Sequence, residues 1–168
     1  MRPREYVSGE QIFYLGRRYV LKVIDAEGGL ETVRLKGNRL EVVAKTRDQP
    51  KIRARVRAWY RVKGRDYIAR RLKLMVPSLP WVEKEPPFRF LEMSRQWGSC
   101  TPKGEIILNP HLIKAPRQCI DYVLVHEMAH LKHHDHSSDF WAIIDTYAGE
   151  WRAAKRHLDG LVEVLLRD

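Results

Sequence analysis

Residues 125–141, VHEMAHLKHHDHSSDFW, contain five of the seven histidines of this 168-residue chain. His126 and His130 are four positions apart, so on an α-helix they lie on one face, about 6 Å apart along the axis. Both imidazoles can then bind one metal ion, and Glu127 can reach a water molecule on that ion without being a ligand. The His-Glu-x-x-His pattern therefore predicts a helix with a metal site on one face.

A third ligand must come from a part of the chain that has left this helix. His133 lies seven residues after His126, about 10 Å further along the axis, so one ion does not easily touch both. His134 is further along still and is rotated away from the shared face. His136 meets the requirement if the helix ends shortly before it. We therefore predict one Zn²⁺ per chain, bound by His126, His130 and His136.

Three histidine ligands leave one coordination position of zinc open, which is the arrangement of a catalytic site. A water molecule there has its pKa lowered toward about 7, and Glu127 is the expected general base that takes its proton. The sequence does not decide which carboxylate orients a ligand imidazole. The candidates are Asp121, Asp135, Asp139 and Asp145. It also leaves open the group that stabilises the oxyanion. The candidates are Tyr122, Tyr147, His111 and Arg152.

The first half of the chain is predicted to form a small β lobe and a long helix. Residues 11–45 contain four short runs rich in Val, Leu, Ile and Tyr, separated by turn-forming residues, which is typical of an antiparallel meander. Apolar residues between 50 and 76 recur at steps of three, four and seven, which predicts an amphipathic helix. Pro50 suits its start and Pro77 suits its end.

A proline-rich connector at 77–87 divides the chain into a predicted N-terminal lobe, residues 1–87, and a predicted catalytic region, residues 88–168. In the second region, residues 88–100 and 104–110 are predicted to be two strands joined by a short turn.

Two helices are predicted to follow these strands, from 116 to 134 and from 138 to 159. Gly149 marks an expected break in the second helix, and Gly160 its expected end. The fold class predicted for the whole chain is therefore α+β.

The formal charge of +10 is carried by the first half of the chain. Residues 1–87 contain 21 Lys and Arg against 10 Asp and Glu, whereas residues 88–168 contain 10 against 11. The stretch 51–73 has ten basic residues, with Asp66 as its only acid. Such a helix face can bind nucleic acid or another polyanion, although a solvated surface explains the charge equally well.

Two further features concern the location of the protein. No segment reaches the roughly 18 consecutive apolar residues of a membrane span, and the N-terminus lacks the apolar run of a secretory signal. The two cysteines, Cys100 and Cys119, are too few for a disulfide framework, so we expect reduced thiols and a cytoplasmic protein.

Three stretches occur in a recognisable order: RQWGSC with KGEIILNP (95–110), IDYVLVHEMAHLKHHDHSSDFW (120–141) and EWRAAKRHLD (150–159). Together they resemble the YgjP-like metallopeptidase family, which is related to SprT-like and WLM domains. The resemblance implies a zincin-like α+β domain with the metal ligands and the catalytic glutamate at the positions given above. It also implies that an edge strand pairs with an extended peptide substrate. That strand is expected at Ile106, Ile107 and Leu108.

The leading hypothesis is therefore a zinc metallopeptidase that hydrolyses peptide bonds with a Glu-activated, metal-bound water. One alternative is a metal-dependent phosphohydrolase of nucleoside triphosphates, although the chain has no Gly-rich phosphate loop followed by Lys. A second is a DNA-associated, SprT-like protease anchored by the basic helix at 51–73. A third is a structural zinc domain, for which the acidity of Glu127 would be irrelevant.

Overall fold

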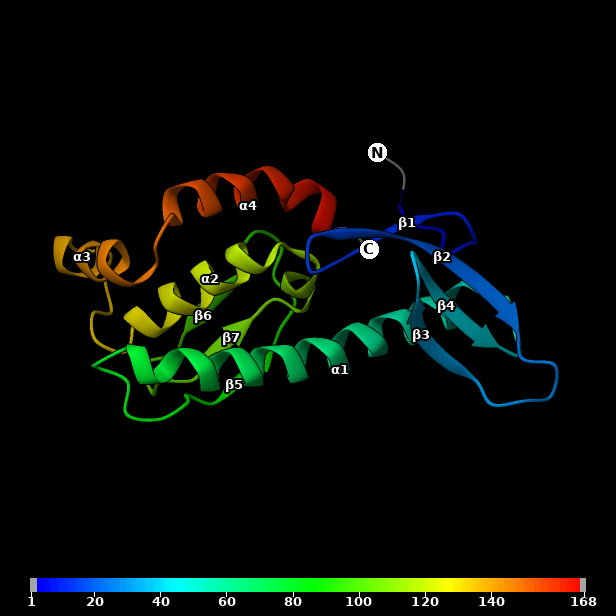
Figure 1. Cartoon of the computed structure of the whole chain (residues 1–168), viewed down its shortest axis with the longest axis horizontal. Coiled ribbons are helices and arrows are strands. Elements are labelled where there is room, and N and C mark those ends of the chain that lie inside the picture. The colour runs from blue at the N-terminus through cyan, green and yellow to red at the C-terminus, as the bar shows by residue number, and fades with distance from the viewer. Residues whose placement is uncertain (1–2, 167–168) are drawn as a thin grey trace.

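The structure is a computed structural model that describes residues 3–166. It is a mixed α+β fold, which confirms the predicted fold class. Figure 1 shows a small β lobe at one end and a helix-rich region at the other, with one long helix running along both. That helix, α1 (Gln49–Met75), has 27 residues, which corresponds to a length of about 40 Å.

The β lobe contains β1 (Gln11–Tyr14), β2 (Arg17–Asp25), β3 (Thr32–Lys36) and β4 (Arg39–Ala44). The spatial order is β1-β2-β4-β3, and the central pair, β2 with β4, is parallel. The predicted simple meander is therefore wrong in its strand order, although the two outer pairs are antiparallel. The reason lies in burial: β4 is almost continuously buried and takes the centre, whereas β3 alternates between half-buried and exposed residues and takes the edge.

The β lobe is held on the catalytic region by main-chain hydrogen bonds. The turn between β1 and β2 donates from Leu15 N to Ile113 O (2.9 Å) and from Gly16 N to Lys114 O (3.0 Å). Gly16 has a φ of +79°, and a Cβ there would lie 2.8 Å from the Pro116 Cα. Only glycine therefore permits both this turn and its close approach to the catalytic region.

The helix α1 begins and ends almost where the sequence predicts. Its buried stripe contains Ile52, Val56, Trp59, Tyr60, Gly64, Tyr67, Ile68 and Leu72. Gly64 has a packing role, because a Cβ at this position would lie 3.1 Å from the Phe90 ring. The basic face is partly neutralised within the chain: Arg55 pairs with Glu31 at 2.7 Å, and Arg71 pairs with Asp121 at 2.9 Å.

The catalytic region contains a second sheet, with β5 (Phe88–Phe90), β6 (Gly98–Cys100) and β7 (Ile106–Leu108) in the order β5-β7-β6. The predicted strand 88–100 is thus two strands with a loop between them. The buried Asn109 amide holds this loop by donating to the carbonyls of Met93 (2.8 Å) and Gln96 (3.1 Å).

The prediction that residues 106–108 form an edge strand is wrong. The strand β7 is paired on both sides, in parallel with β5 and antiparallel with β6, and all three of its residues, Ile106, Ile107 and Leu108, are buried. Such a continuous apolar run is typical of a central strand. The two edges of this sheet are formed by β5 and β6, and β6 is the one whose residues line the cleft described below.

Three helices complete the fold: α2 (Arg117–Ala129), α3 (Ser138–Tyr147) and α4 (Trp151–Leu165). The predicted break lies at Gly149, where φ is +53°. The predicted end at Gly160 is wrong, because α4 continues to Leu165, which is almost fully buried. The gain from burying that side chain exceeds the cost of about 1 kcal/mol for a glycine inside a helix.

The connector 77–87 follows a short 3-10 helix, η1 (Val76–Ser78), and is packed onto the catalytic region. Leu79 and Val82 are buried, and the Trp81 Nε1 donates to the Met128 carbonyl at 2.7 Å. A second 3-10 helix, η2 (Pro110–Lys114), lies between β7 and α2. The division of the chain at residue 87 remains a prediction.

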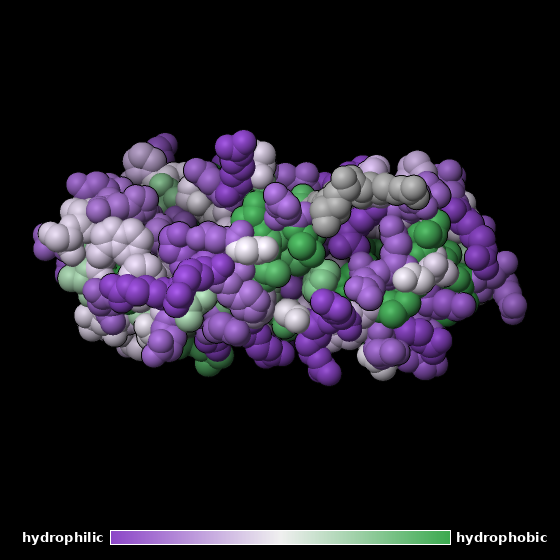
Figure 2. All heavy atoms as spheres, turned by 90° about the horizontal axis from the view of Figure 1, so that it is seen from above, coloured by the Kyte–Doolittle hydropathy of each residue, from purple (hydrophilic) through white to green (hydrophobic). Residues whose placement is uncertain are grey.

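Most of the upper face is hydrophilic. Figure 2 shows hydrophobic residues near the middle of this face and again over the β lobe. Among the described residues, no helix is long and apolar enough to cross a membrane.

Candidate metal centre

Three histidines converge at the end of α2. One ring nitrogen from each of His126, His130 and His136 lies within 4.8 Å of the other two. The Nε2 atoms of His126 and His136 are 3.2 Å apart. Two ligands at about 2.0–2.1 Å from one tetrahedral ion are about 3.3 Å apart, so this pair already has the spacing of zinc ligands.

The local backbone explains how His136 reaches the site. The helix α2 ends at Ala129, earlier than predicted, and turn hydrogen bonds continue to His133, whose N donates to the Ala129 carbonyl at 3.0 Å. The chain then reverses and starts α3, where the Ser137 side chain accepts from Phe140 N at 3.3 Å. This N-cap fixes the entry into α3 immediately after His136.

The other ring nitrogens of two histidines have partners in the protein. The Nδ1 of His130 lies 3.0 Å from the His133 carbonyl, and the Nδ1 of His126 lies 3.3 Å from the Tyr122 hydroxyl. A carbonyl can only accept, so His130 carries its proton on Nδ1 and keeps Nε2 as a ligand atom. His133 therefore contributes to the site through its backbone and not through its ring.

Aromatic rings surround the three histidines. Phe140 stacks on His130 with ring centroids 4.6 Å apart, and Trp141 stacks on His136 at 5.8 Å. Trp141 in turn stacks on Trp151 at the start of α4, at 5.0 Å. Phe140 is fully buried. His136 lies between α2 and α3 and belongs to neither helix. These ring contacts therefore restrict the orientation of its side chain.

The Glu127 side chain follows His126 on α2 and packs against Gly98 of β6. Its side chain is 5% exposed, and its Oε2 atom is buried with no hydrogen-bond partner among the described residues. A Cβ at Gly98 would lie only 3.0 Å from the Cγ and Oε1 atoms of Glu127. Glycine in β6 thus makes the space that this carboxylate occupies.

Burial governs the protonation of the centre. It lowers the pKa of His126 to about 4, with smaller contributions from the neighbouring His130 and His136. It also lowers the pKa of His130. His126 and His130 are therefore neutral near pH 7, as metal ligands must be. Burial raises the pKa of Glu127 to about 8, because no partner stabilises its charged form.

The centre opens into a cleft of about 510 Å³. One wall is formed by residues 95–100, including the edge strand β6, and the opposite wall by residues of α2 and α4. The cleft is lined by Arg95, Gln96, Trp97, Gly98, Ser99, Cys100, Tyr122, Val123, His126, Glu127, His130, His134, His136, Lys155, Leu158 and Asp159. A strand edge beside two half-buried histidines, an exposed third one and a buried carboxylate can hold an extended chain against a hydrolytic centre.

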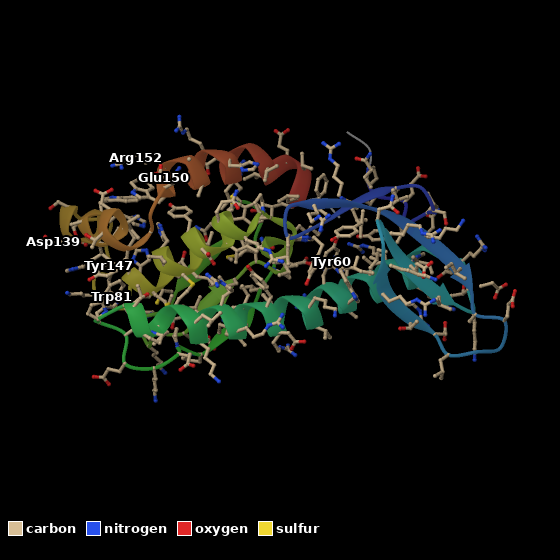
Figure 3. The ribbon with its side chains drawn as sticks, in the orientation of Figure 1. Tyr60, Trp81, Asp139, Tyr147, Glu150 and Arg152 are labelled. Atoms are coloured by element: carbon tan, nitrogen blue, oxygen red, sulfur yellow. The ribbon has the colours of Figure 1, made fainter. Side chains whose placement is uncertain are left out.

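Of the four predicted oxyanion donors, Tyr122 lines this cleft. Tyr147 packs against Trp81 with ring centroids 5.1 Å apart, and Arg152 pairs with Asp145 at 3.2 Å. Figure 3 places Tyr147 and Arg152 near the end of the molecule where α3 meets α4. The fourth candidate, His111, lines a separate small cavity.

The aspartates considered as partners of the ligand imidazoles are placed differently. Asp121 is bound by Arg71, and Asp145 accepts from the Trp151 Nε1 at 2.8 Å. Among the described residues, no hydrogen bond joins Asp135 or Asp139 to a histidine ring. The actual partners, a tyrosine and a backbone carbonyl, could not be identified from sequence, because a carbonyl carries no residue-specific signal.

A family model described as the YgjP-like, metallopeptidase domain matches residues 1–160. The chain belongs to the YgjP-like family. This confirms the resemblance found in the sequence, and it makes the chain a member of a family of metal-dependent peptidases. Among solved structures, the chain is similar to the crystal structure of the metallopeptidase zymogen of Pyrococcus abyssi abylysin. The identity is 27%, the match covers 58% of this chain and 93% of that chain, and the TM-score is 0.46. No curated protein matches this chain significantly.

Proposed function

We propose that this protein is a zinc-dependent peptidase in which His126, His130 and His136 bind one Zn²⁺ and Glu127 is the general base. The observation that carries the proposal is the position of a buried carboxylate, with an oxygen that has no hydrogen-bond partner among the described residues, beside three converging histidines. Such a carboxylate is costly to keep in a fold unless it has a task.

The donor set fits zinc better than other metals. Three imidazole nitrogens suit Zn²⁺, whereas Mg²⁺ and Ca²⁺ prefer oxygen ligands. When bound, zinc supplies Lewis-acid chemistry, since it polarises a carbonyl group and acidifies a water molecule. The 3.2 Å spacing of the His126 and His136 Nε2 atoms supports this assignment.

Glu127 could act as a general base once its charged form is favoured, which a cation bound by the three neighbouring histidines would do, because an opposite charge lowers the pKa of a carboxyl group. In its charged form, Oε2 can take the proton of the attacking water, and the carboxyl group can then pass that proton to the leaving amine. The contact with Gly98 restricts the carboxylate to one side of the cleft. The Tyr122 hydroxyl has its pKa raised to about 12 by burial, so it stays protonated and holds His126 in place.

The substrate is proposed to be an unfolded segment of protein that adds as a strand to β6. The backbone of Gly98, Ser99 and Cys100 forms the sheet edge at the cleft, and it supplies hydrogen bonds that do not depend on the substrate's side chains. This moves the proposed peptide-binding strand from residues 106–108 to residues 98–100. A cytoplasmic location, expected from the low cysteine content, is part of the proposal.

The test combines metal analysis with activity. The wild-type protein should bind about one zinc per chain and cleave an unfolded protein. Glu127→Gln should retain zinc and lose at least about 100-fold in kcat, because a general base contributes about 10²–10⁴-fold. His136→Ala should lose zinc, whereas His157→Ala is a control outside the cleft. Retention of zinc by His136→Ala would contradict the ligand set, and Glu127-dependent hydrolysis of nucleoside triphosphates without proteolysis would contradict the substrate class.

A further inference from the structure

A second concave site lies far along α1 from the metal centre, where the start of the helix meets the N-terminal segment. It is a groove of about 580 Å³. Its lining consists of Arg4, Glu5, Tyr6, Gln49, Pro50, Arg53, Ala54, Arg57, Ala58 and Arg61. Among the lining residues that the structure describes, four are arginines and one, Glu5, is a carboxylate, and none of these residues lines the metal cleft.

Three of the arginines form a ladder on α1. Arg53, Arg57 and Arg61 are each four residues apart, so their side chains follow one face at steps of about 6 Å. Like charges at this spacing destabilise a helix by a few tenths of a kcal/mol per pair. Arg57 is held by an ion pair with Glu92, which orients its guanidinium group. Guanidinium groups spaced in this way along one groove can contact several negative charges of a single ligand.

The fourth arginine comes from outside the helix. Arg4 donates from NH1 to the Gln11 carbonyl at 2.7 Å, and this bond fixes the side chain. Its Nε atom is buried and has no hydrogen-bond partner among the described residues. A buried guanidinium nitrogen without an acceptor is uncommon, because burial removes the water that would otherwise bind it. An anion in the groove would provide the missing acceptor.

A buried lysine adjoins the groove on its inner side. Lys114 is 3% exposed, its Nζ lies 2.7 Å from the His111 Nδ1, and it sits 4.9 Å from the centroid of the Tyr60 ring. Figure 3 shows Tyr60 above α1 near the middle of the molecule. Burial, together with the charges of Arg4 and Arg57, lowers the pKa of Lys114 to about 7. The positive field of the groove therefore extends into the interior of the protein.

We infer that this groove is a binding site for a compact anion that carries two or more phosphate groups. Guanidinium groups bind phosphate oxygens in pairs of hydrogen bonds, and four of them match a ligand with dense charge. The volume lies in the range of small-ligand sites, about 300–1,000 Å³. Tyr6, the aromatic residue of the lining, is buried, so the groove has no exposed ring on which nucleic-acid bases could stack. The inference goes beyond the proposed peptidase activity and does not depend on it.

The test is calorimetric titration of the purified protein with inorganic tripolyphosphate at near-physiological salt. The informative variant is Arg53→Ala with Arg61→Ala, which removes both ends of the ladder and leaves the Arg57 ion pair intact. The matched control is Lys63→Ala with Arg65→Ala, which removes the same charge from exposed positions of the same helix outside the groove. We expect the first pair to weaken binding at least about tenfold and the control less than about twofold, because only the first removes direct charge-assisted hydrogen bonds.

Tripolyphosphate also binds zinc, so the titration is repeated after the metal has been removed with a chelator. Unchanged binding is expected, and it would separate this site from the metal centre. Loss of the signal with the metal would overturn the inference, as would equal weakening by the two double variants, which would indicate a diffuse field. Binding of a single-stranded oligonucleotide but not of tripolyphosphate would also overturn it. None of these outcomes depends on whether the protein cleaves peptides.

Discussion

Gly98→Ala is the most informative single change near the proposed catalytic base. The added Cβ would lie 3.0 Å from the Cγ and Oε1 atoms of Glu127, whereas non-bonded heavy atoms prefer about 3.5 Å. Because β6 is fixed by its pairing with Leu108 in β7, the glutamate must move by about 0.5 Å. A displacement of 1 Å in an active site can cost about 100-fold in rate, so we expect about a tenfold loss, or roughly 1.4 kcal/mol of activation free energy.

The assay for this prediction measures kcat/KM on an unfolded protein substrate, the zinc content and the free energy of unfolding. Zinc should be retained, because the three atoms nearest to the new methyl group all belong to Glu127 and none to a histidine. Stability should fall by about 1 kcal/mol through overpacking. Gly160→Ala is the matched control, since a Cβ there meets nothing within 4 Å. It should leave activity unchanged and raise stability by about 0.5–1 kcal/mol.

Wild-type kcat/KM in the Gly98→Ala variant would refute the reasoning, since the glutamate would then tolerate the displacement or would not be the base. Loss of zinc together with activity would refute it differently, by showing that the change moves α2 as a whole and not the Glu127 side chain alone.

Three further predictions concern other parts of the molecule. Trp141→Ala removes the ring stacked on His136 and should weaken zinc affinity about 10–100-fold in a chelator competition, as does the loss of other groups that orient ligands; unchanged affinity would show that the stack does not orient the ligand. Gly64→Ala brings a Cβ within 3.1 Å of the Phe90 ring, and the overpacking cost of about 1–3 kcal/mol is offset by about 1 kcal/mol from the better helix propensity of alanine, so the free energy of unfolding should fall by up to about 2 kcal/mol in denaturant titrations; a more stable variant would contradict this packing argument. Lys114 has a folded-state pKa of about 7, below its usual 10.5, so between these two pH values the unfolded chain binds a proton that the folded chain has lost. The free energy of unfolding of the wild-type protein should therefore rise as the pH increases from about 7 to 10.5, and Lys114→Met should lack this rise. Parallel profiles of the free energy of unfolding against pH for the two proteins would contradict this prediction.

The helical parts of the fold were predictable because their signals are local. The apolar stripe of α1 and the prolines at its ends set its bounds to within a residue or two. The break at Gly149 follows from the same kind of signal, since glycine readily adopts the left-handed backbone found there. The end of α4 was mispredicted, because a glycine in a helix has only a local cost, whereas the burial of Leu165 depends on tertiary packing.

Strand order was less predictable because pairing partners are distant in sequence. The sequence shows the apolar runs that form β2, β3 and β4. Nothing in residues 32–36, however, indicates that β3 takes the edge beside β4, so that β4 lies between β3 and β2 and pairs in parallel with β2. The same applies to β7, whose three apolar residues identify a strand without showing whether one or both of its edges are occupied. Burial of the whole run in the core gave it the central place and left the two edges to β5 and β6.

The sequence alone determined the spacing of His126 and His130 on one helix face and the position of Glu127 between them, because helix geometry fixes these relations within a few residues. It also predicted that His136 must return from outside the helix. Only the tertiary structure decided what surrounds these residues: Gly98 on β6 makes room for the glutamate, and Trp151 on α4 supports the ring that stacks on His136. It likewise gathered Arg4 with the arginines of α1 into one groove. The physical reason for this difference is the sequence separation over which the interactions act. Helix periodicity relates residues three or four positions apart, whereas close packing and burial join segments that are tens of residues apart.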